Sequence, residues 1–255
     1  MALRDKTYFI SDTHLGSHNY ADPREVECRV VRWLDSVKSD AKDIYLLGDI
    51  LDYWYEYRWV VPKGYIRFFG KLAELADMGV GIHWLVGNHD VWLYSYLQEQ
   101  IGVEVLDGNV IREIDGSRVL MAHGDGVGNV PLSMRIIRTL FRSRLCQWLY
   151  SMLPVSLTMA FANGWSVTSR KGHVRLTTER QTAKMNVALS RLRDFCHSVK
   201  KDEQKIDYFI FGHLHCLRQE DVNDGDSKMV ILGYWGSESP YAVLDNSGLR
   251  LCKME

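Results

Sequence analysis

The sequence predicts an α/β fold in which mainly parallel strands alternate with helices. Short, continuous apolar runs such as residues 44–47 recur along the chain, and strands covered on both faces have this composition. Segments with apolar residues at helical spacing, such as residues 25–37, lie between these runs. Several of the runs end in Gly, Asp, Asn or His. Open α/β sheets bind their ligands at the carboxyl ends of the strands.

Length and composition limit the classes of protein to consider. The 255 residues are enough for one large domain, or for one domain that carries an insertion. The net charge of −1 gives no reason to expect a nucleic-acid partner. Five scattered cysteines without a CxxC pair indicate free thiols in a reducing compartment. Because the first residues lack a signal-peptide pattern and no apolar run reaches a membrane-span length, we expect a cytoplasmic protein.

In the first half of the chain, three expected strands each deliver polar side chains. Residues 8–14 form the first and end in Asp12 and His14; the second ends at Asp49 after a helix over 25–37. Five aromatic residues within 53–59 follow, and they indicate either local packing or the wall of a binding site. A helix is expected over 62–78, a third strand over 82–86, and a further helix over 92–100.

The second half supplies two more strand ends. Residues 110–114 and 119–122 flank an Asp-Gly pair, which predicts a hairpin, and His123 follows its second strand. The apolar run 208–211 leads into His213 and His215. Three later runs predict an antiparallel meander that closes the fold: residues 229–232, 241–244 and 249–252.

Residues 126–178 differ in composition from the rest of the chain. These 53 residues contain seven Arg or Lys and no Asp or Glu. Apolar residues recur there at helical intervals, from Leu132 to Leu153 and on to Trp165. The segment is interpreted as a helical insertion between two strands of the main sheet. Its apolar stripe serves either as a binding surface or only to pack on the main domain.

The polar residues at the strand ends form a candidate metal centre. All are oxygen or nitrogen donors of the kind that binds Mn²⁺, Fe²⁺ or Zn²⁺. Asp49 follows the middle strand, so we expect it to bridge two metal ions. Two adjacent cations neutralise a phosphate group and stabilise the entering and leaving oxygens of a displacement at phosphorus. The candidate set is Asp12, His14, Asp49, Asn88, His89, His123, His213 and His215.

The ordered motifs D-x-H, G-D-x-x-D, G-N-H-D, H-G-D and G-H-x-H resemble those of the calcineurin-like metallophosphoesterase superfamily across nearly the whole chain. The resemblance implies a single domain over residues 1–255 with a four-layer αββα sandwich, two mixed sheets flanked by helices. It implies that His89 protonates the leaving oxygen or stabilises the transition state, and that Asp90 orients His89. The implied metal ligands are Asp12, His14 and His215 for one ion and Asn88, His123 and His213 for the other, with Asp49 shared.

A finer resemblance is to the UDP-2,3-diacylglucosamine pyrophosphatases of lipid A biosynthesis. It is carried by the short motif spacing, the aromatic stretch after Asp52 and the helical insertion. It implies an acylated UDP-sugar lipid as substrate, lipid X and UMP as products, Mn²⁺ as the usual metal, and a helical lid at about 128–178. We expect peripheral association with the anionic cytoplasmic face of the inner membrane and no obligate protein partner. Substrate contacts are expected at Asn88, His89, Trp54, Arg58, Ser166 and Arg170.

The chain departs from the best-known branch of that family in three places. His89 stands where Arg is usual, Asn129 and Pro131 occupy a region that usually holds an acid, and Cys216-Leu217 replaces a common Arg-Pro pair. These differences leave open a phosphoesterase that acts on a soluble nucleotide or other phosphodiester, which needs an open cleft. A scaffold without catalysis is a third hypothesis, but scaffolds usually lose metal ligands, and here every expected ligand is present.

Overall fold

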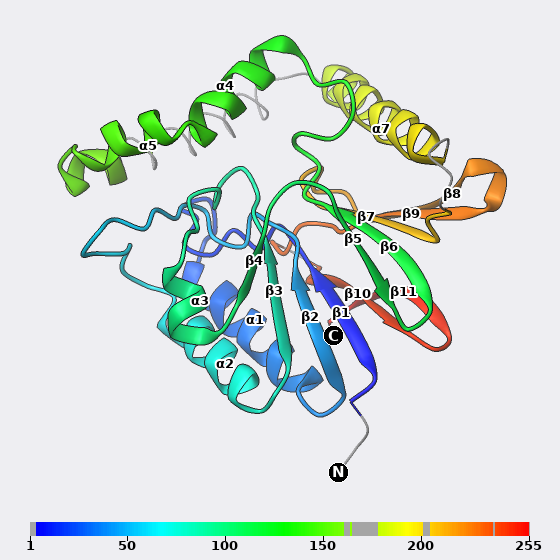
Figure 1. The fold of residues 1–255 in the computed structure, drawn as a ribbon, viewed down its shortest axis with the longest axis horizontal. Helices are drawn as coiled ribbons and strands as arrows, with labels where there is room; N and C mark the ends of the chain where they lie inside the picture. Colours follow the sequence, from blue (N-terminus) through cyan, green and yellow to red (C-terminus); the bar gives the residue numbers. More distant parts are fainter. Residues whose placement is uncertain (1–3, 161–163, 165–177, 201–204, 237, 255) are drawn as a thin grey trace.

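Two β-sheets pack face to face between layers of helices in the computed structural model, which describes residues 4–160, 164, 178–200, 205–236 and 238–254 (Figure 1). This arrangement confirms the expected four-layer αββα sandwich. The five cysteines are all free, as their scattered positions predict.

The first sheet has six strands in the order β11-β10-β1-β2-β3-β4. Its strands are β1 (Lys6–Ile10), β2 (Ala41–Leu46), β3 (Gly81–Leu85), β4 (Glu104–Leu106), β10 (Pro240–Asp245) and β11 (Gly248–Lys253). Strands β1 to β4 run parallel, and the C-terminal hairpin β10–β11 joins the edge of β1 antiparallel. The carboxyl ends of β1, β2 and β3 therefore lie side by side.

Helices α1 (Pro23–Val37), α2 (Ile66–Asp77) and α3 (Tyr96–Ile101) flank the outer face of this sheet (Figure 1). Val30 and Trp33 of α1 pack there against Ile10 and Ile44 of the strands. Asp22 caps the first turn of α1 by accepting hydrogen bonds from the backbone of Arg24 and Glu25.

The second sheet has five strands in the order β5-β6-β7-β9-β8. Its strands are β5 (Val110–Ile114), β6 (Ser117–Ala122), β7 (Tyr208–Phe211), β8 (Arg218–Val222) and β9 (Ser227–Ile231), with the short 3₁₀ helix η1 (Asn223–Gly225) between β8 and β9. The long helix α7 (Thr178–Lys200) covers the outer face through Leu189, Leu192 and Cys196. Strands β6 and β7 are parallel neighbours, so their carboxyl ends also meet.

The space between the two sheets is a closed apolar core. Side chains alternate along each strand: Phe9 points between the sheets, while Tyr8 and Ile10 point toward the helices. In the second sheet Met121 faces the inter-sheet core and Leu120 faces α7. This period of two is the ordinary alternation of strand side chains, and it fixes the register that brings the strand ends together.

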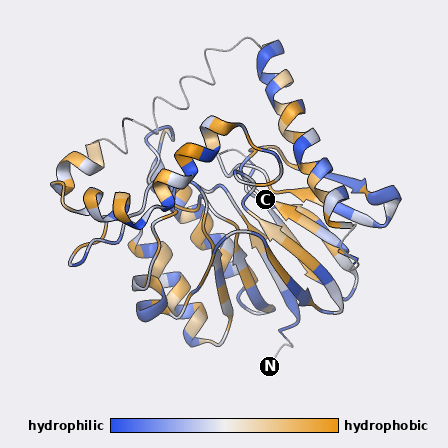
Figure 2. Cartoon of the chain, turned by 45° about the horizontal axis from the view of Figure 1, so that its top comes forward, coloured by the Kyte–Doolittle hydropathy of each residue, from blue (hydrophilic) through white to orange (hydrophobic). Residues whose placement is uncertain are grey.

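Helices α4 (Leu132–Arg142) and α5 (Arg144–Ser151) follow β6 and lie across the carboxyl ends of the strands (Figure 1). They are called the α4–α5 segment below. No residue of α4 is buried, and apolar residues stand on its surface among hydrophilic ones (Figure 2). Seven large apolar side chains of the segment are at least 44% exposed: Leu132, Met134, Ile136, Leu140, Leu145, Trp148 and Leu149. Within the described residues, no helix combines the length and hydrophobicity that a membrane-spanning segment requires.

The structure corrects several sequence predictions. The helices expected at residues 62 and 92 begin later, at Ile66 and Tyr96. The closing meander is wrong, because β9 pairs with β7 and β8 in the second sheet while β10 and β11 form a hairpin in the first. Strands β4 and β8 and helix α7 were not expected, although Met185, Leu189, Leu192 and Cys196 have the spacing that indicates an amphipathic helix.

Candidate metal centre

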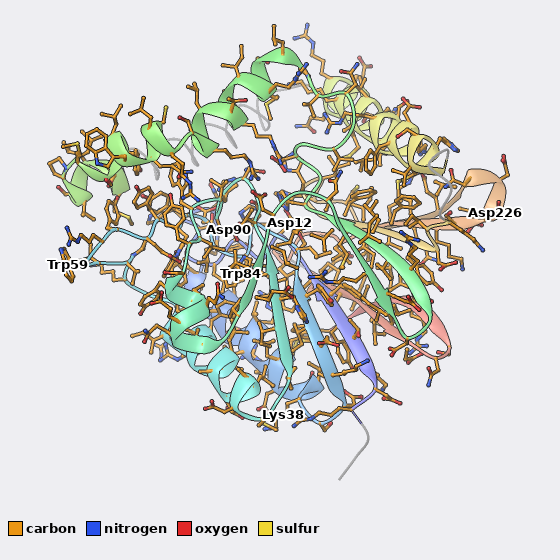
Figure 3. The ribbon with its side chains drawn as sticks, viewed as in Figure 1. Asp12, Lys38, Trp59, Trp84, Asp90 and Asp226 are labelled. Carbon is orange, nitrogen blue, oxygen red and sulfur yellow. The ribbon has the colours of Figure 1, made fainter. Side chains whose placement is uncertain are left out.

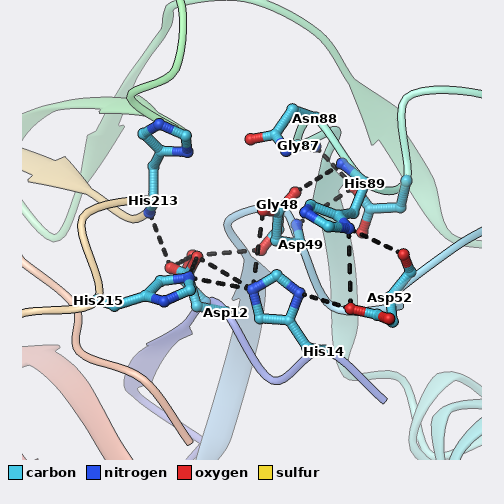
Figure 4. Close-up of polar contacts among 12 residues, drawn as sticks. Asp12, His14, Gly48, Asp49, Asp52, Gly87, Asn88, His89, His213 and His215 are labelled. Atoms are coloured by element: carbon cyan, nitrogen blue, oxygen red, sulfur yellow. Dashed lines mark hydrogen bonds and ion pairs between the residues drawn. The ribbon is translucent and has the colours of Figure 1, made fainter. Parts of the chain in front are cut away.

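The loops after β1, β2, β3, β6 and β7 meet at one edge, where the two sheets come together (Figure 4). Backbone hydrogen bonds join neighbouring loops: Asp12 N–H donates to Gly48 O at 3.1 Å, and Gly212 N–H donates to His123 O at 2.9 Å. A third contact crosses between the sheets, since His213 N–H donates to the Asp12 carboxylate at 2.8 Å. The predicted ligand residues therefore share one site despite their separation in sequence.

Much of this site is built from backbone in the left-handed region. Five of the seven predicted ligands have positive φ angles, between 42° and 67°: Asp12, His14, Asp49, His213 and His215. Residues other than glycine adopt this conformation at a cost in energy, and such residues concentrate at functional sites. The surrounding sheets hold the strained loops in place, which presets the direction of each side chain.

Two motif glycines are required by close approach. At Gly87, a Cβ atom would collide with the Asp49 carboxylate and the Asp49 backbone nitrogen. At Gly212, it would overlap Ser11 Oγ and come within 2.7 Å of the Asp12 carboxylate. Any side chain at either position would displace a predicted metal ligand.

The ligand atoms fall into overlapping groups within 4.8 Å. The first contains Asp12, His14 and His215; the second contains Asp49, His123 and His213; a third joins His14, Asp49 and His89. In the first group, His215 Nε2 lies 3.1 Å from His14 Nε2 and 3.2 Å from Asp12 Oδ1. In the second, His123 Nε2 lies 3.3 Å from Asp49 Oδ2 and 3.3 Å from Asn88 Oδ1. Asp49 Oδ2 is also 3.8 Å from His14 Nε2, so Asp49 faces both groups.

Contacts behind these residues leave the ligand atoms directed inward. His123 Nδ1 donates to Leu47 O at 2.9 Å, which leaves Nε2 as the ligand nitrogen. His14 Nδ1 lies 3.3 Å from Asp52 Oδ1, and this contact leaves Nε2 of His14 as the candidate ligand nitrogen. Asp12 Oδ1 is buried and makes no aligned hydrogen bond. A buried carboxylate oxygen of this kind, surrounded by imidazole nitrogens, fits a divalent cation.

The buried acids and histidines of the site shift one another's pKa values. Burial raises the pKa of Asp49, but the nearby His123, His89 and His14 outweigh burial and hold that pKa well below its usual range. Burial also opposes ionisation of Asp12, and His215 and His123 lower its pKa overall. Both acids are therefore carboxylates. Burial and the charge of His123 lower the pKa of His213 to about 4, so His213 is a neutral imidazole suited to metal binding.

His89 sits at the mouth of this site. Its backbone N–H donates to Asp49 Oδ1 at 2.8 Å, and its ring Nδ1 donates to Asp52 O at 2.9 Å. The His89 ring meets the His14 ring edge to face, with 4.8 Å between centroids. Because Nδ1 is occupied, Nε2 is the atom left to face a substrate.

A family model described as calcineurin-like phosphoesterase matches residues 6–217. The chain belongs to the calcineurin-like phosphoesterase family. A UDP-2,3-diacylglucosamine hydrolase of Porphyromonas gingivalis is 39% identical over 267 residues, which cover 99% of both chains. Proteins of the same name from Edwardsiella ictaluri and Nitrosococcus oceani are 26% and 28% identical, over 97% and 90% of this chain and 92% and 87% of theirs.

In this calcineurin-like phosphoesterase, the Asp90 carboxylate hydrogen-bonds to backbone N–H groups and not to the His89 ring. Its carboxylate accepts hydrogen bonds from Gly87 N at 2.7 Å, Ile50 N at 2.9 Å, Asp49 N at 3.2 Å and the Trp84 indole at 3.1 Å. The expectation that Asp90 orients His89 is therefore corrected, since Asp52 makes that contact. Burial and the charge of Asp49 raise the pKa of Asp90 to about 6. Asp90 joins the two loops that carry Asp49 and Asn88, a role that its position in the motif alone did not reveal.

The structure also tests the expected substrate contacts of the phosphoesterase. Asn88 and His89 lie at the site. The expected contact of Trp54 with the substrate is wrong. Trp54 is fully buried, packs edge to face on Phe69 and donates a hydrogen bond to Glu56, so it has no surface for a substrate. Arg58 is exposed and stacks on Trp59, which lies at an edge of the molecule, away from Asp12 (Figure 3). Ser166 and Arg170 lie outside the described residues.

The rest of the aromatic stretch packs against the α4–α5 segment and the residues that follow it. Tyr55 Oη donates to Gln147 O of α5 at 2.7 Å, and Tyr53 Oη lies 3.1 Å from Tyr150 Oη. Trp92, three residues after His89, donates its indole N–H to Phe141 O of α4 at 2.8 Å. These residues are called the aromatic junction below. Of the two interpretations of residues 53–59, local packing holds for Tyr53 and Tyr55.

Proposed function

We propose that this phosphoesterase hydrolyses the pyrophosphate bond of UDP-2,3-diacylglucosamine to give 2,3-diacylglucosamine 1-phosphate (lipid X) and UMP in lipid A biosynthesis. The observation that carries the proposal is the 39% identity to the Porphyromonas gingivalis hydrolase over 99% of both chains. A relationship of that extent includes both the strand-end motifs and the α4–α5 segment.

The ligand groups fit two divalent ions, and Mn²⁺ is the ion we propose. Asp12, His14 and His215 would hold one ion, Asn88, His123 and His213 the other, and Asp49 would contact both. When bound, such ions neutralise the phosphate charge and stabilise the entering and leaving oxygens. The buried carboxylates Asp12 and Asp49 keep this position negative and therefore selective for cations.

His89 is the residue proposed to act on the leaving group. The Asp52 carbonyl fixes its ring through Nδ1, so a proton on Nε2 is directed toward the phosphate. In the protonated form the ring donates to the leaving oxygen or stabilises the extra negative charge of the transition state. The His89 backbone N–H donates a hydrogen bond to Asp49 Oδ1, and this bond fixes the position of His89 relative to the proposed metal ligands.

The α4–α5 segment is proposed as part of a lid at about residues 128–178 that receives the acyl chains. The segment lies across the strand ends that carry the candidate metal centre (Figure 1), and its apolar side chains are exposed. Each CH₂ group that such a surface removes from water contributes about 0.8 kcal/mol, although the cost of ordering the chains reduces the net gain. We propose further that the protein works at the anionic cytoplasmic face of the inner membrane, without an obligate protein partner.

Product analysis with three substrates tests this function. We expect release of UMP from UDP-2,3-diacylglucosamine in detergent micelles, with kcat/KM about 10²-fold above that for UDP-N-acetylglucosamine. A chelator should abolish the reaction and Mn²⁺ should restore it. Equal activity toward the sugar without long acyl chains, or preference for a small phosphodiester, would instead support a phosphoesterase with a soluble substrate.

A further inference from the structure

A second exposed surface runs from the end of the aromatic stretch through the following loop to the first residues of α2. Residues 57–67, called the basic aromatic loop below, contain Arg58, Lys63 and Arg67 and no Asp or Glu. Trp59 is 84% exposed and Ile66 is 81% exposed, and Val60 between them is half exposed. Large apolar side chains that are exposed next to one another and to cations are typical of an interaction site.

Two acids that adjoin this loop are engaged by backbone N–H groups. Glu56 turns inward, where its carboxylate accepts hydrogen bonds from the backbone of Tyr94 and Tyr96. Glu27 accepts from Arg67 N and Phe68 N at the start of α2. Both carboxylates thus accept hydrogen bonds from backbone N–H groups. Arg58 instead stacks on the Trp59 indole, with 5.0 Å between Cζ and the ring centroid. The loop presents cations beside an indole.

The basic aromatic loop and the α4–α5 segment lie at the same edge of the molecule (Figures 1 and 3). At the base of the loop, Tyr57 Oη hydrogen-bonds to Thr158 Oγ1, which follows the α4–α5 segment in the chain. Tyr57 also packs with Tyr150 of α5 in one apolar cluster. The base of the loop is therefore packed against α5, so the two exposed apolar surfaces lie on connected parts of the fold.

We infer that the basic aromatic loop is a membrane-contact site that inserts Trp59 and Val60 at the interface of an anionic lipid bilayer. Exposed indole rings favour the headgroup region of a bilayer, and clustered Arg and Lys side chains are attracted to anionic lipid. The inference rests on the proposed function, because it places the entrance of the site against the membrane that contains the substrate. It assigns to Arg58 a contact with lipid headgroups in place of the nucleotide-sugar contact expected from the sequence.

Binding to lipid vesicles tests the inference with two variants. Trp59→Ser/Val60→Ser removes the apolar tip, and Arg58→Gln/Lys63→Gln/Arg67→Gln removes the cations. Each variant is expected to bind vesicles of phosphatidylglycerol and phosphatidylcholine about 10- to 100-fold more weakly than the wild-type protein. The loss from the charge variant should diminish as salt is raised. Both variants should turn over a small phosphodiester at the wild-type rate, which would show that they are folded.

Matched controls separate this site from general effects of charge and hydrophobicity. Lys42→Gln/Arg112→Gln/Lys253→Gln removes three exposed cations elsewhere, and Val187→Ser removes an exposed apolar side chain of α7. The controls should bind vesicles as the wild-type protein does. Loop variants that bind as tightly as the controls would overturn the inference, as would self-association without vesicles that the Trp59 variant abolishes, since the loop would then join two copies of the chain.

The same variants keep this inference distinct from the proposed function. Hydrolysis of the diacylated substrate in detergent micelles needs no bilayer, so loop variants should retain it there and lose it on vesicles. If the wild-type protein fails to hydrolyse the substrate in micelles, the proposed function is wrong, whereas the vesicle-binding result still decides the role of the loop.

Discussion

The metal centre and the α4–α5 segment are constructed in opposite ways. Asp12, His14 and Asp49 are at most 2% exposed and are held by backbone hydrogen bonds between loops that the two sheets fix. No residue of α4 is buried, and the segment is attached mainly through the aromatic junction and ion pairs such as Arg138 with Asp125. The fold thus positions the candidate metal ligands by burial and backbone hydrogen bonds, whereas α4 contributes no buried residue. We infer that catalysis depends on the first region and substrate selection on the second.

The largest expected effect is on the metal centre. Asp49→Ala removes the ligand that faces both groups, so turnover of any phosphoester should fall by at least about 10³-fold. Bound metal, measured by elemental analysis, should fall as well. Asp221→Asn, at an exposed strand position, is the control and should change neither quantity. Full activity of Asp49→Ala would end the two-metal proposal.

His89→Ala should separate catalysis from metal binding within the same site. The expected loss of turnover is about 10²- to 10⁴-fold, because a general acid or a charge near the leaving oxygen is removed. Metal content should stay near the wild-type level, since His89 is not among the seven proposed ligands. A variant that loses metal in proportion to activity would show that His89 is itself a ligand.

A change to the α4–α5 segment should affect one substrate only. Ile136→Asp/Leu140→Asp places two charges on its apolar face and should reduce kcat/KM for the diacylated substrate by about 10- to 100-fold. Turnover of a small phosphodiester should not change, because the metal ligands lie on other elements. The matched control is Ile111→Asp/Val187→Asp, at two exposed apolar positions of β5 and α7. Equal losses with both substrates would show that the segment supports the fold and not substrate selection.

The smallest effect is expected at the aromatic junction. Tyr55→Phe removes the hydroxyl that donates to Gln147 O and loosens the attachment of α5. A hydrogen bond of this kind contributes about 0.5–1.5 kcal/mol, so KM for the diacylated substrate should rise about 3- to 10-fold. The kcat for a small phosphodiester should stay constant, and Tyr96→Phe provides the surface control. A change in kcat with both substrates would instead indicate that the junction also positions His89 through Trp92.

Sequence patterns predicted which residues gather at the candidate metal centre better than they predicted its surroundings, for a physical reason. Asp49 and His123 are recognisable because a polar donor directly after an apolar run is unusual and because the strand ends of a sheet converge. The role of Asp90 depends on which backbone groups approach it, and no local pattern records that. Trp54 was wrongly expected at the substrate, because the sequence does not distinguish an aromatic side chain that lines a site from one that packs in the core. The strand pairing of β9 was missed because period-two patterns do not specify the partner strand.

The position of β1 has a consequence for how the chain folds. β1 lies between β2, which follows it closely, and β10, with Thr7 opposite Leu244 near the end of the sequence. Asp12 likewise contacts His213, 201 residues later. Closing contacts of such sequence separation costs chain entropy and slows folding. On the ribosome, β1 must therefore wait for nearly the whole chain before it pairs on both sides, and a chain truncated before β7 would lack His213 and His215 and could not assemble the metal centre.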